Sequence, residues 1–413
     1  MSPSLALLLV MFGGLLLLAM FLDDLAAEIK VPGILLVLVL GLLIDNDLSP
    51  GAGGSVPLLS FAAAEQLAQL SLALVLFFGG LTANWTQMKP VLGPSLRLAV
   101  LGSLLTAGCL SLVVMGFQSL PATAVDVNVP VALFVGAMFC STDASAVLSL
   151  LRPLQGRLPK PLLDLLECES GLNDPIAVVL AGLALAIAGG GEAQVELLMV
   201  AVVREFLLGA FLGWLGGKAA AGLLSRRQAA AYGGLAIVLS MALLMLIVGG
   251  SALVGASGLL AAYVMGVVLG NSPEVNRAAL EESHSGFAKL AELTLFLCLG
   301  LVVMPSDVAL SFKYALVLFV AVLLVRWLVV QLLLVRSGFR RRERTFTAMA
   351  GLRGAVPIAI AIQAASSSVP WGRDMPPFAL AVVLLGLVLQ GFALVPLARR
   401  LGLVRAPEPE LSS

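Results

Sequence analysis

Long apolar stretches separated by short polar joints follow one another along almost the whole chain. Each stretch approaches the ~20 apolar residues that an α-helix needs to cross the hydrocarbon core of a membrane. We therefore predict an all-α polytopic membrane protein with about thirteen transmembrane helices. The predicted spans are residues 4–22, 31–45, 57–82, 90–117, 129–151, 160–190, 195–217, 229–249, 251–270, 285–304, 309–335, 343–365 and 376–398.

Composition and charge narrow the class of protein further. Hydrophobic residues occupy 60% of the 413 positions and charged residues only 12%, whereas soluble domains carry about 25% charged residues. The formal net charge is zero, which gives no support for a nucleic acid partner. The four cysteines have no metal-like spacing, and we expect no cofactor.

The distribution of lysine and arginine predicts the orientation in the membrane. With the N-terminus outside and the C-terminus in the cytoplasm, most of the 24 basic residues fall in cytoplasmic joints, as the positive-inside rule requires. In this orientation residues 399–413 form a short cytoplasmic tail.

Polar and ionisable residues inside the spans gather in three places. Such residues are costly in a membrane and usually functional. The fifth span contains FCSTDASAVLSLL, the sixth contains LECESGLNDPIAVVL, and the twelfth contains AGLRGAVPIAI. The candidate residues in these segments are Thr142, Asp143, Glu167, Glu169, Ser170, Asn173, Asp174 and Arg353.

Helical spacing brings two of these residues onto one face of the sixth span. Ser170 and Asp174 are four residues apart, so their side chains are neighbours on the helix surface. At ~1.5 Å per residue, Asp174 lies ~20 Å deep, a depth similar to that of Asp143 in the fifth span. Two acids that meet near the midplane would form the oxygen-rich site that a hard cation prefers.

The acids of the sixth span are expected to have different partners. A buried carboxylate without a counter-ion is costly to ionise, so Asp174 could hold either a proton or a cation. For Glu169 we predict a structural ion pair with Arg353, which would tie the sixth span to the twelfth. Glu167 is either part of a cytoplasmic funnel or a charge at the start of the helix.

Small residues and proline predict that two of the spans are interrupted. Gly351, Gly354 and Pro357 surround Arg353 in the twelfth span, and small polar residues follow Thr142 in the fifth. Interrupted helices at matching positions of two halves mark the binding site of inverted-repeat transporters. Spans 5 and 12 are seven apart, which fits six spans, a linker helix and six inverted spans.

Three segments, TDASAVLSLLR, ESGLNDP and GLRGAVP, resemble the signature regions of NhaP-type cation:proton antiporters of the sodium/proton exchanger superfamily. The resemblance implies a homodimer in which a core domain moves like an elevator against a dimerisation domain. The transmembrane unit would be residues 1–398, with the core in parts of 90–190 and 285–398 and the dimerisation domain in the remaining spans. We also expect a bacterial inner membrane location and contact with membrane lipids.

The same resemblance implies roles for individual residues. Asp174 would be the shared cation and proton site, with Asn173 before it as in electroneutral members. Thr142, Asp143 and Ser170 would complete the cation site. The Glu169–Arg353 ion pair agrees with the family pattern.

Residue 144 bears on the choice of cation. Sodium-type members usually have proline after the Thr-Asp pair, and Ala144 stands there in this chain, which favours the bacterial potassium–proton branch. That branch often has a cytosolic regulatory domain after the last span, so such a domain is expected to be missing or separate here.

Several functions remain open. The preferred interpretation is exchange of K⁺ or Na⁺ for protons by a transporter that is not an enzyme. A cation channel also uses acids at mid-depth but conducts without obligatory exchange. A proton-coupled symporter or anion carrier on the same fold would need basic or amide groups at the helix crossing.

Overall fold

The computed structural model describes residues 3–29, 31–44, 46, 57–117, 119–120, 125–189, 195–226 and 233–405. The predicted tail, residues 399–413, lies partly outside this set, because 406–413 are not described. The same is true of Lys30 and Arg227, two of the basic residues behind the predicted orientation.

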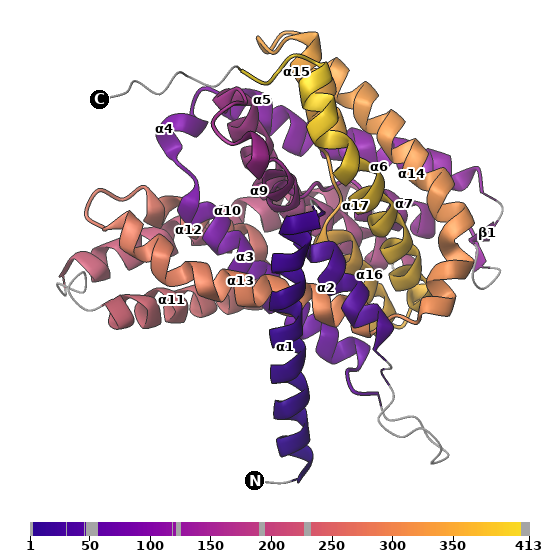
Figure 1. Ribbon diagram of the computed structural model, residues 1–413, viewed down its shortest axis with the longest axis horizontal. Coiled ribbons are helices and arrows are strands. Elements are labelled where there is room, and N and C mark those ends of the chain that lie inside the picture. Colours follow the sequence, from indigo (N-terminus) through magenta and orange to yellow (C-terminus); the bar gives the residue numbers. More distant parts are fainter. Residues whose placement is uncertain are drawn as a thin grey trace.

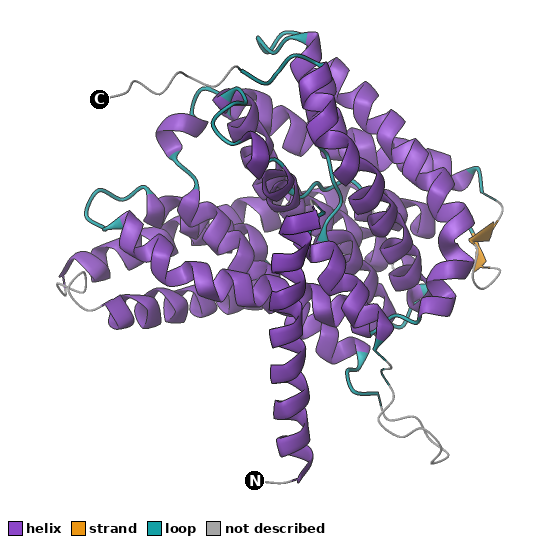
Figure 2. Ribbon diagram, viewed as in Figure 1, coloured by secondary structure: helices purple, strands orange, loops and turns teal. Residues whose placement is uncertain are grey.

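The helices and strands of the described part are joined by loops, and all of its regular elements are helical apart from one pair of two-residue strands (Figure 2). The long helices are α1 (Pro3–Ile29), α3 (Phe61–Thr82), α9 (Lys160–Ala188), α10 (Val195–Arg226), α11 (Gly233–Leu253), α13 (Arg277–Leu301), α14 (Pro305–Leu333) and α17 (Met375–Arg400). The shorter helices are α2 (Gly33–Leu43), α4 (Trp85–Met88), α5 (Leu92–Leu96), α6 (Ser103–Met115), α7 (Val129–Met138), α8 (Ala144–Leu150), α12 (Gly258–Gly270), α15 (Arg341–Met349) and α16 (Ala355–Ser366). A π-helical segment, Arg97–Gly102, joins α5 to α6, and 3₁₀ turns lie at Arg152–Leu154 and Gly372–Asp374. The strands are β1 (Ser119–Leu120) and β2 (Val125–Asp126).

The hydrophobic pattern predicted the spans well. Among the described residues, nine helical segments are long and apolar enough to cross a membrane, and four shorter apolar helices accompany them. Together they follow the thirteen predicted spans in order, which confirms the all-α polytopic architecture. Several boundaries shift by seven to nine residues: α12 begins only at Gly258, α13 begins already at Arg277, and α10 continues to Arg226.

Two helix pairs confirm the predicted interruptions. The fifth span is made of α7 and α8, separated by non-helical residues 139–143. The twelfth span is made of α15 and α16, separated by residues 350–354. By contrast, α9 continues as one helix through Pro175, so the sixth span is not broken.

The helices form two groups on either side of α1 (Figure 1). In the view of Figure 1, α10, α11 and α12 lie to the left, and α6, α7, α14, α16 and α17 lie to the right. We call these two sets of helices the left group and the right group. One hydrophobic cluster joins α3 to the left group, and a larger cluster runs through α7, α9, α16 and α17.

Close backbone contact fixes α3 against α12. A Cβ atom at Gly266 would lie 2.2 Å from the carbonyl oxygen of Phe77, and one at Gly80 would lie 2.2 Å from that of Tyr263. Only glycine allows the two helices to approach this closely, which is the way membrane helices gain packing energy without a hydrophobic driving force. Helix α3 therefore belongs firmly to the left group while its other side faces the right group.

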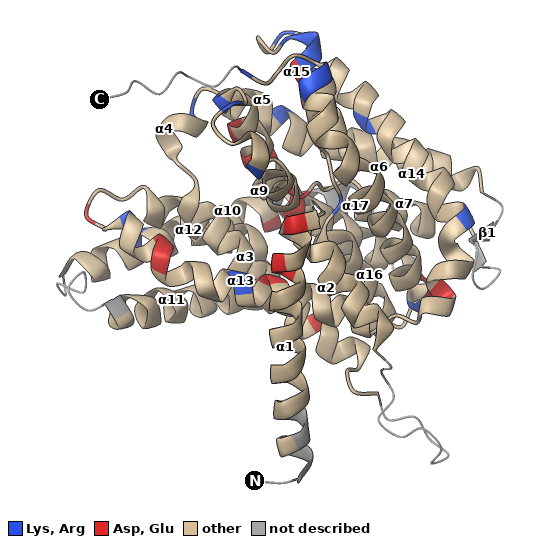
Figure 3. Cartoon of the chain, in the orientation of Figure 1, with Lys and Arg blue, Asp and Glu red and all other residues tan. Residues whose placement is uncertain are grey.

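Charged side chains are sparse and unevenly placed (Figure 3). Basic residues concentrate at the end of the molecule that carries the start of α15, where Arg341, Arg342 and Arg344 follow one another. The orientation of this end relative to the membrane stays a prediction.

Candidate cation site

The two interrupted helices meet at their breaks. The amide of Asp143 donates a hydrogen bond of 2.9 Å to the carbonyl oxygen of Leu352. Backbone groups that leave a helix inside a membrane need partners within the protein, and this bond supplies one. The crossing that the sequence predicted from glycine, proline and small polar residues is therefore held by main-chain atoms.

Helix α9 joins the crossing through a small polar network. Asn173 Nδ2 donates to Thr142 Oγ1 at 2.8 Å, and the Thr142 amide donates to Asn173 Oδ1 at 3.3 Å. Thr142 Oγ1 also lies 3.1 Å from Ser170 Oγ. All three side chains are buried, so the network is shielded from water. Thr142, Ser170 and Asn173 are thus brought together as predicted, but mainly to bind one another.

Asp143 caps the second half of the fifth span. Its carboxylate accepts from the Ala146 amide at 3.1 Å and from Ser145 Oγ at 2.6 Å, which begins α8. The other carboxylate oxygen lies against Gly354, where an added Cβ would be only 1.8 Å away. Because Gly354 immediately precedes α16, the Asp143 carboxylate touches the start of both half-helices.

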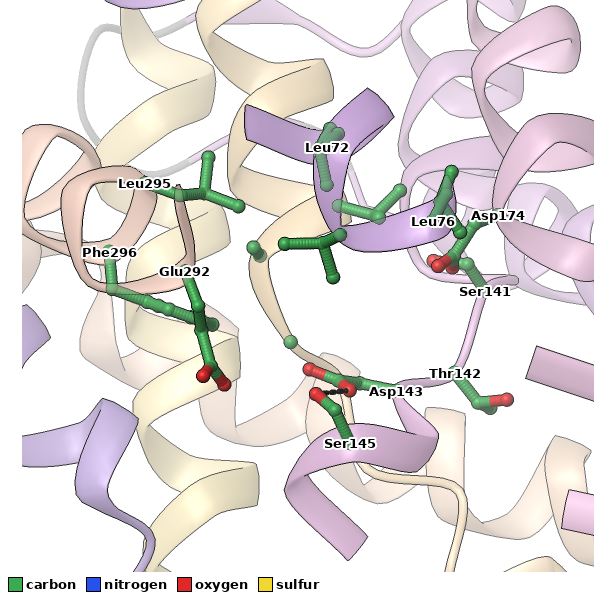
Figure 4. A pocket seen from close by; sticks show the side chains of 14 residues that line it. Leu72, Leu76, Ser141, Thr142, Asp143, Ser145, Asp174, Glu292, Leu295 and Phe296 are labelled. Carbon is green, nitrogen blue, oxygen red and sulfur yellow. Dashed lines mark hydrogen bonds between the residues drawn. The ribbon is translucent and has the colours of Figure 1, made fainter. Parts of the chain in front are cut away.

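Asp174 faces a small cavity of about 50 Å³ at the crossing (Figure 4). Its carboxylate lies beside the Ser141 hydroxyl. The cavity is also lined by Thr142 and Asp143, by Leu72 and Leu76 of α3, and by Glu292 of α13. None of the ion pairs between described residues includes Asp174. The site therefore lies between the left and right groups, and its acid Asp174 forms no ion pair with a described residue.

Glu169 has a different partner from the predicted one. Its carboxylate pairs with the Arg326 guanidinium of α14, with Nη2 2.6 Å from Oε1 and 2.8 Å from Oε2. The side chains of Arg326 and Glu169 are 2% and 0% exposed, so the pair is fully desolvated. The structure thus ties the sixth span to the eleventh, and the predicted pairing of Glu169 with Arg353 is corrected.

Arg353 is buried at the break of the twelfth span. Its Nη1 donates to the carbonyl oxygen of Gly351 at 2.9 Å. Its Nε and Nη2 atoms have no hydrogen-bond partner among the described residues. The arginine therefore hydrogen-bonds to its own non-helical segment, two residues before it in the chain, and no ion pair between described residues joins it to a carboxylate of α9.

Three residues that contribute to the site were not predicted to do so. Ser141 and Glu292 line the cavity, and Arg326 neutralises Glu169. The signal for Arg326 was its position as a lone arginine inside an apolar span. Glu167, the candidate funnel residue, is half-buried on α9 and does not line the cavity.

The carboxylates around the cavity are spread along its walls. Among the described residues, no three acidic, histidine or cysteine side chains are close enough to form a ready-made metal cluster. The oxygen groups at the cavity are carboxylates on separate elements, together with the hydroxyls of Ser141 and Thr142.

Comparison with known proteins agrees with this architecture. The transmembrane sodium/hydrogen exchanger family matches residues 13–400. A K(+)/H(+) antiporter NhaP2 of Shewanella sp. (strain MR-4) is 32% identical over 401 residues, which cover 95% of this chain and 66% of that protein. An Na(+)/H(+) antiporter NhaP of Pseudomonas aeruginosa is 30% identical over 365 residues, covering 82% of this chain and 81% of that protein. The chain spans about two thirds of the length of the Shewanella relative.

A solved structure shares the fold. The sodium proton antiporter MjNhaP1 from Methanocaldococcus jannaschii, solved at pH 8, superposes with a TM-score of 0.78 at 23% sequence identity. The superposition covers 96% of this chain and 99% of that one. The family match over nearly the whole chain, together with the Pseudomonas relative, shows that this chain belongs to the sodium/hydrogen exchanger family.

Proposed function

We propose that this protein exchanges a monovalent cation for protons across the membrane, with Asp174 as the group that binds each in turn. The observation that carries the proposal is the contrast between two acids on α9. Glu169 forms an ion pair with a buried arginine, whereas Asp174 faces a cavity and forms no ion pair with a described residue. A carboxylate in that position is stabilised either by a proton or by a cation, and the two therefore compete.

The remaining site residues have supporting roles in this proposal. Asp143 lies close enough to the cavity to share the cation, and Ser141 and Thr142 can supply hydroxyl or carbonyl oxygens. Asn173 and Ser170 hold Thr142 in place through their hydrogen bonds. The Asn173–Asp174 pair contains a single acid, which can bind one proton or one monovalent cation at a time. One cation is therefore exchanged for one proton, and the exchange is electroneutral.

K⁺ is the proposed cation. Ala144 follows the Thr-Asp pair, and relatives from Shewanella and from Alkalimonas amylolytica are K(+)/H(+) antiporters by name. The Pseudomonas relative is an Na(+)/H(+) antiporter by name. The preference for K⁺ over Na⁺ is therefore tested separately from the exchange itself.

The site lies between two groups of helices, which supports an alternating-access movement. In the proposal, the core drawn from parts of 90–190 and 285–398 slides against a dimerisation domain made by the other spans. The protein acts as a homodimer in a bacterial inner membrane, in contact with lipids, with its N-terminus outside and its C-terminus in the cytoplasm.

Proton movement in inside-out vesicles tests the exchange. A pH-sensitive dye reports proton release after K⁺, Na⁺ or Li⁺ is added over a series of pH values. We expect release with the wild-type protein, most strongly with K⁺, and none with Asp174→Asn. Asp164→Asn is the matched control, because it makes the same change on the same helix outside the cavity.

Other outcomes would exclude the proposal in different ways. Cation flux without proton movement would indicate a channel. Proton movement that persists in Asp174→Asn would place the exchange at another acid. A rate that depends on an imposed membrane potential would contradict electroneutral exchange.

A further inference from the structure

An ion-pair triad connects α1 with α13 beside the cation cavity. The Lys289 ammonium lies 2.8 Å from a carboxylate oxygen of Asp23 and 3.2 Å from one of Glu292. Lys289 and Glu292 are three residues apart on α13, so they share one face of the helix. Their side chains are 41% and 21% exposed, in contrast to the closed pair formed by Glu169 and Arg326.

The triad lies between two hollows. Glu292 lines the cavity that also contains Asp143 and Asp174. Figure 4 shows the Glu292 carboxylate on the wall opposite Asp143. Lys289 and Asp23 instead line a second and more polar hollow of about 370 Å³. We call this second hollow the vestibule.

Helix α8 connects the same two hollows. Ser145, near its start, lines the cavity, and Ser149 and Leu150, near its end, line the vestibule. The vestibule also contains Arg152 and Arg399, which the basic-residue pattern places on the cytoplasmic side. The turn of α13 from Lys289 to Glu292 therefore has one end in the vestibule and the other in the cavity that contains Asp174.

The two acids of the triad are not equivalent. Asp23 lies against the first residue of α2, since a Cβ at Gly33 would be 1.8 Å from its Oδ1 atom. The N-terminus of a helix attracts a negatively charged group, so Asp23 has a favourable contact in addition to its ion pair with Lys289. Glu292 has Lys289 as its partner but no helix N-terminus, and its carboxylate faces the cavity. Glu292 is thus the acid that can change partner.

Charge counting shows what the triad can accept. Two carboxylates and one ammonium leave one negative charge, which one monovalent cation would balance. The Lys289 ammonium is itself a monovalent cation at hydrogen-bond distance from Glu292. When an ion reaches Glu292, Lys289 can pair with Asp23 alone, so no charge is left buried without a partner.

We infer that Glu292 is a further carboxylate of the transport path, and that Lys289 is a tethered cation that competes with the transported ion for it. The inference rests on the proposed exchange function. Glu292 would receive the ion from the vestibule and pass it to Asp143 and Asp174. Once the ion has left Glu292, the Lys289 ammonium would pair with that carboxylate again. Lys289 thereby sets how much cation the vestibule side needs before exchange begins.

A purely structural clasp between α1 and α13 makes the opposite prediction. If the triad only fastened the two helices, removal of either Lys289 or Glu292 would weaken the protein and impair exchange in the same direction. If Lys289 competes with the ion, the two substitutions must change the apparent cation affinity in opposite directions. The sign of the change therefore separates the two roles.

The test measures the K⁺ concentration that gives half-maximal proton release in inside-out vesicles, with the melting temperature of each variant recorded in parallel. Glu292→Gln should raise this concentration about fivefold, in line with the loss of a partly exposed charge interaction. Lys289→Gln should lower it by a similar factor. In the double variant, Lys289→Gln should have no further effect, because the carboxylate for which it competes is gone.

Two matched variants control for general effects of charge. Arg399→Gln removes one positive charge from the same vestibule without contact with Glu292, and we expect less than about a twofold change because water and salt screen it. Glu282→Gln removes an exposed carboxylate from the same helix and should change nothing. Right-side-out vesicles should show a smaller effect of Lys289→Gln, since the ion then enters from the other face.

The possible failures are distinguishable. Absence of exchange in the wild-type protein would overturn the proposed function. Exchange that requires Asp174 but has the same half-maximal K⁺ concentration in Glu292→Gln and Lys289→Gln would overturn this inference alone. A shift in the same direction in both variants, or an equal shift in Arg399→Gln, would do so as well.

Discussion

Glu169 and Asp174 lie five residues apart on one continuous helix, yet their surroundings are opposite. Glu169 is fully buried and paired with Arg326, while Asp174 is half-buried beside a cavity and has no ion pair. Removing one partner of a buried pair leaves a charge that neither water nor protein neutralises. The comparison shows that an acid in a membrane helix can either stabilise the fold or take part in ion exchange. Whether it has a basic partner decides between these roles.

The largest effect should follow from separating the buried pair. Arg326→Gln leaves Glu169 charged and buried, which should lower the free energy of unfolding by about 3–5 kcal/mol. Thermal melting in detergent would show this as a large drop in the midpoint, together with poor expression. Arg353→Gln is the contrasting variant, because Arg353 donates only to the backbone of its own segment in the described structure.

The double variant sharpens this prediction. Glu169→Gln combined with Arg326→Gln removes both charges, so it should be more stable than Arg326→Gln alone. If Arg353→Gln proved more destabilising than Arg326→Gln, Glu169 would have to pair with Arg353 in the working protein.

Asp174→Asn should separate stability from activity. The substitution breaks no ion pair, so the melting temperature should stay the same or rise, while exchange falls by about a hundredfold or more, equivalent to at least ~2.7 kcal/mol. Melting curves and vesicle assays on one preparation would test both halves. A strongly destabilised Asp174→Asn would show that Asp174 is a structural acid like Glu169.

A smaller effect is expected where Asp143 touches α16. In Gly354→Ala the new methyl group would displace the Asp143 carboxylate, and the half-maximal cation concentration should rise about tenfold, equivalent to ~1.4 kcal/mol. Gly182→Ala on α9 is the matched control, because no atom lies within 4 Å of a Cβ added there. Equal affinities in both variants would mean that Asp143 does not share the cation.

The smallest effect concerns the polar network that supports the site. Thr142→Val keeps the shape of the side chain but leaves Asn173 Nδ2 without its acceptor, at a cost of about 1 kcal/mol. The melting midpoint should fall slightly while exchange persists at a reduced rate. A complete loss of exchange with an unchanged midpoint would instead make the Thr142 hydroxyl an essential ion ligand.

The sequence was sufficient for those features that depend on local pattern. Apolar length predicted the spans, and glycine, proline and small polar residues predicted the breaks around Thr142 and Arg353. The meeting of α9 with both breaks was expected because three polar segments stood out from an apolar background. These signals are each contained within one segment of the chain.

Partner choice was not predictable in the same way. Whether Glu169 meets Arg326 or Arg353 depends on how spans six, eleven and twelve pack, and each arginine stands alone in its own span. Glu292 was hidden for a different reason. With Lys289 three residues before it, it has the spacing of an ordinary surface pair on a helix, and only the packing of α13 against the crossing brings it into the cavity.

The contact of Asp143 with the beginnings of α8 and α16 has a consequence for how the site could diversify. The groups that hold this carboxylate include the Ala146 main-chain amide and the helix end after Gly354, and peptide dipoles neither titrate nor depend on residue type. The electrostatic field that these main-chain groups produce at the crossing therefore depends on the path of the chain. Side chains around it could be exchanged during evolution to suit another ion without rebuilding that field.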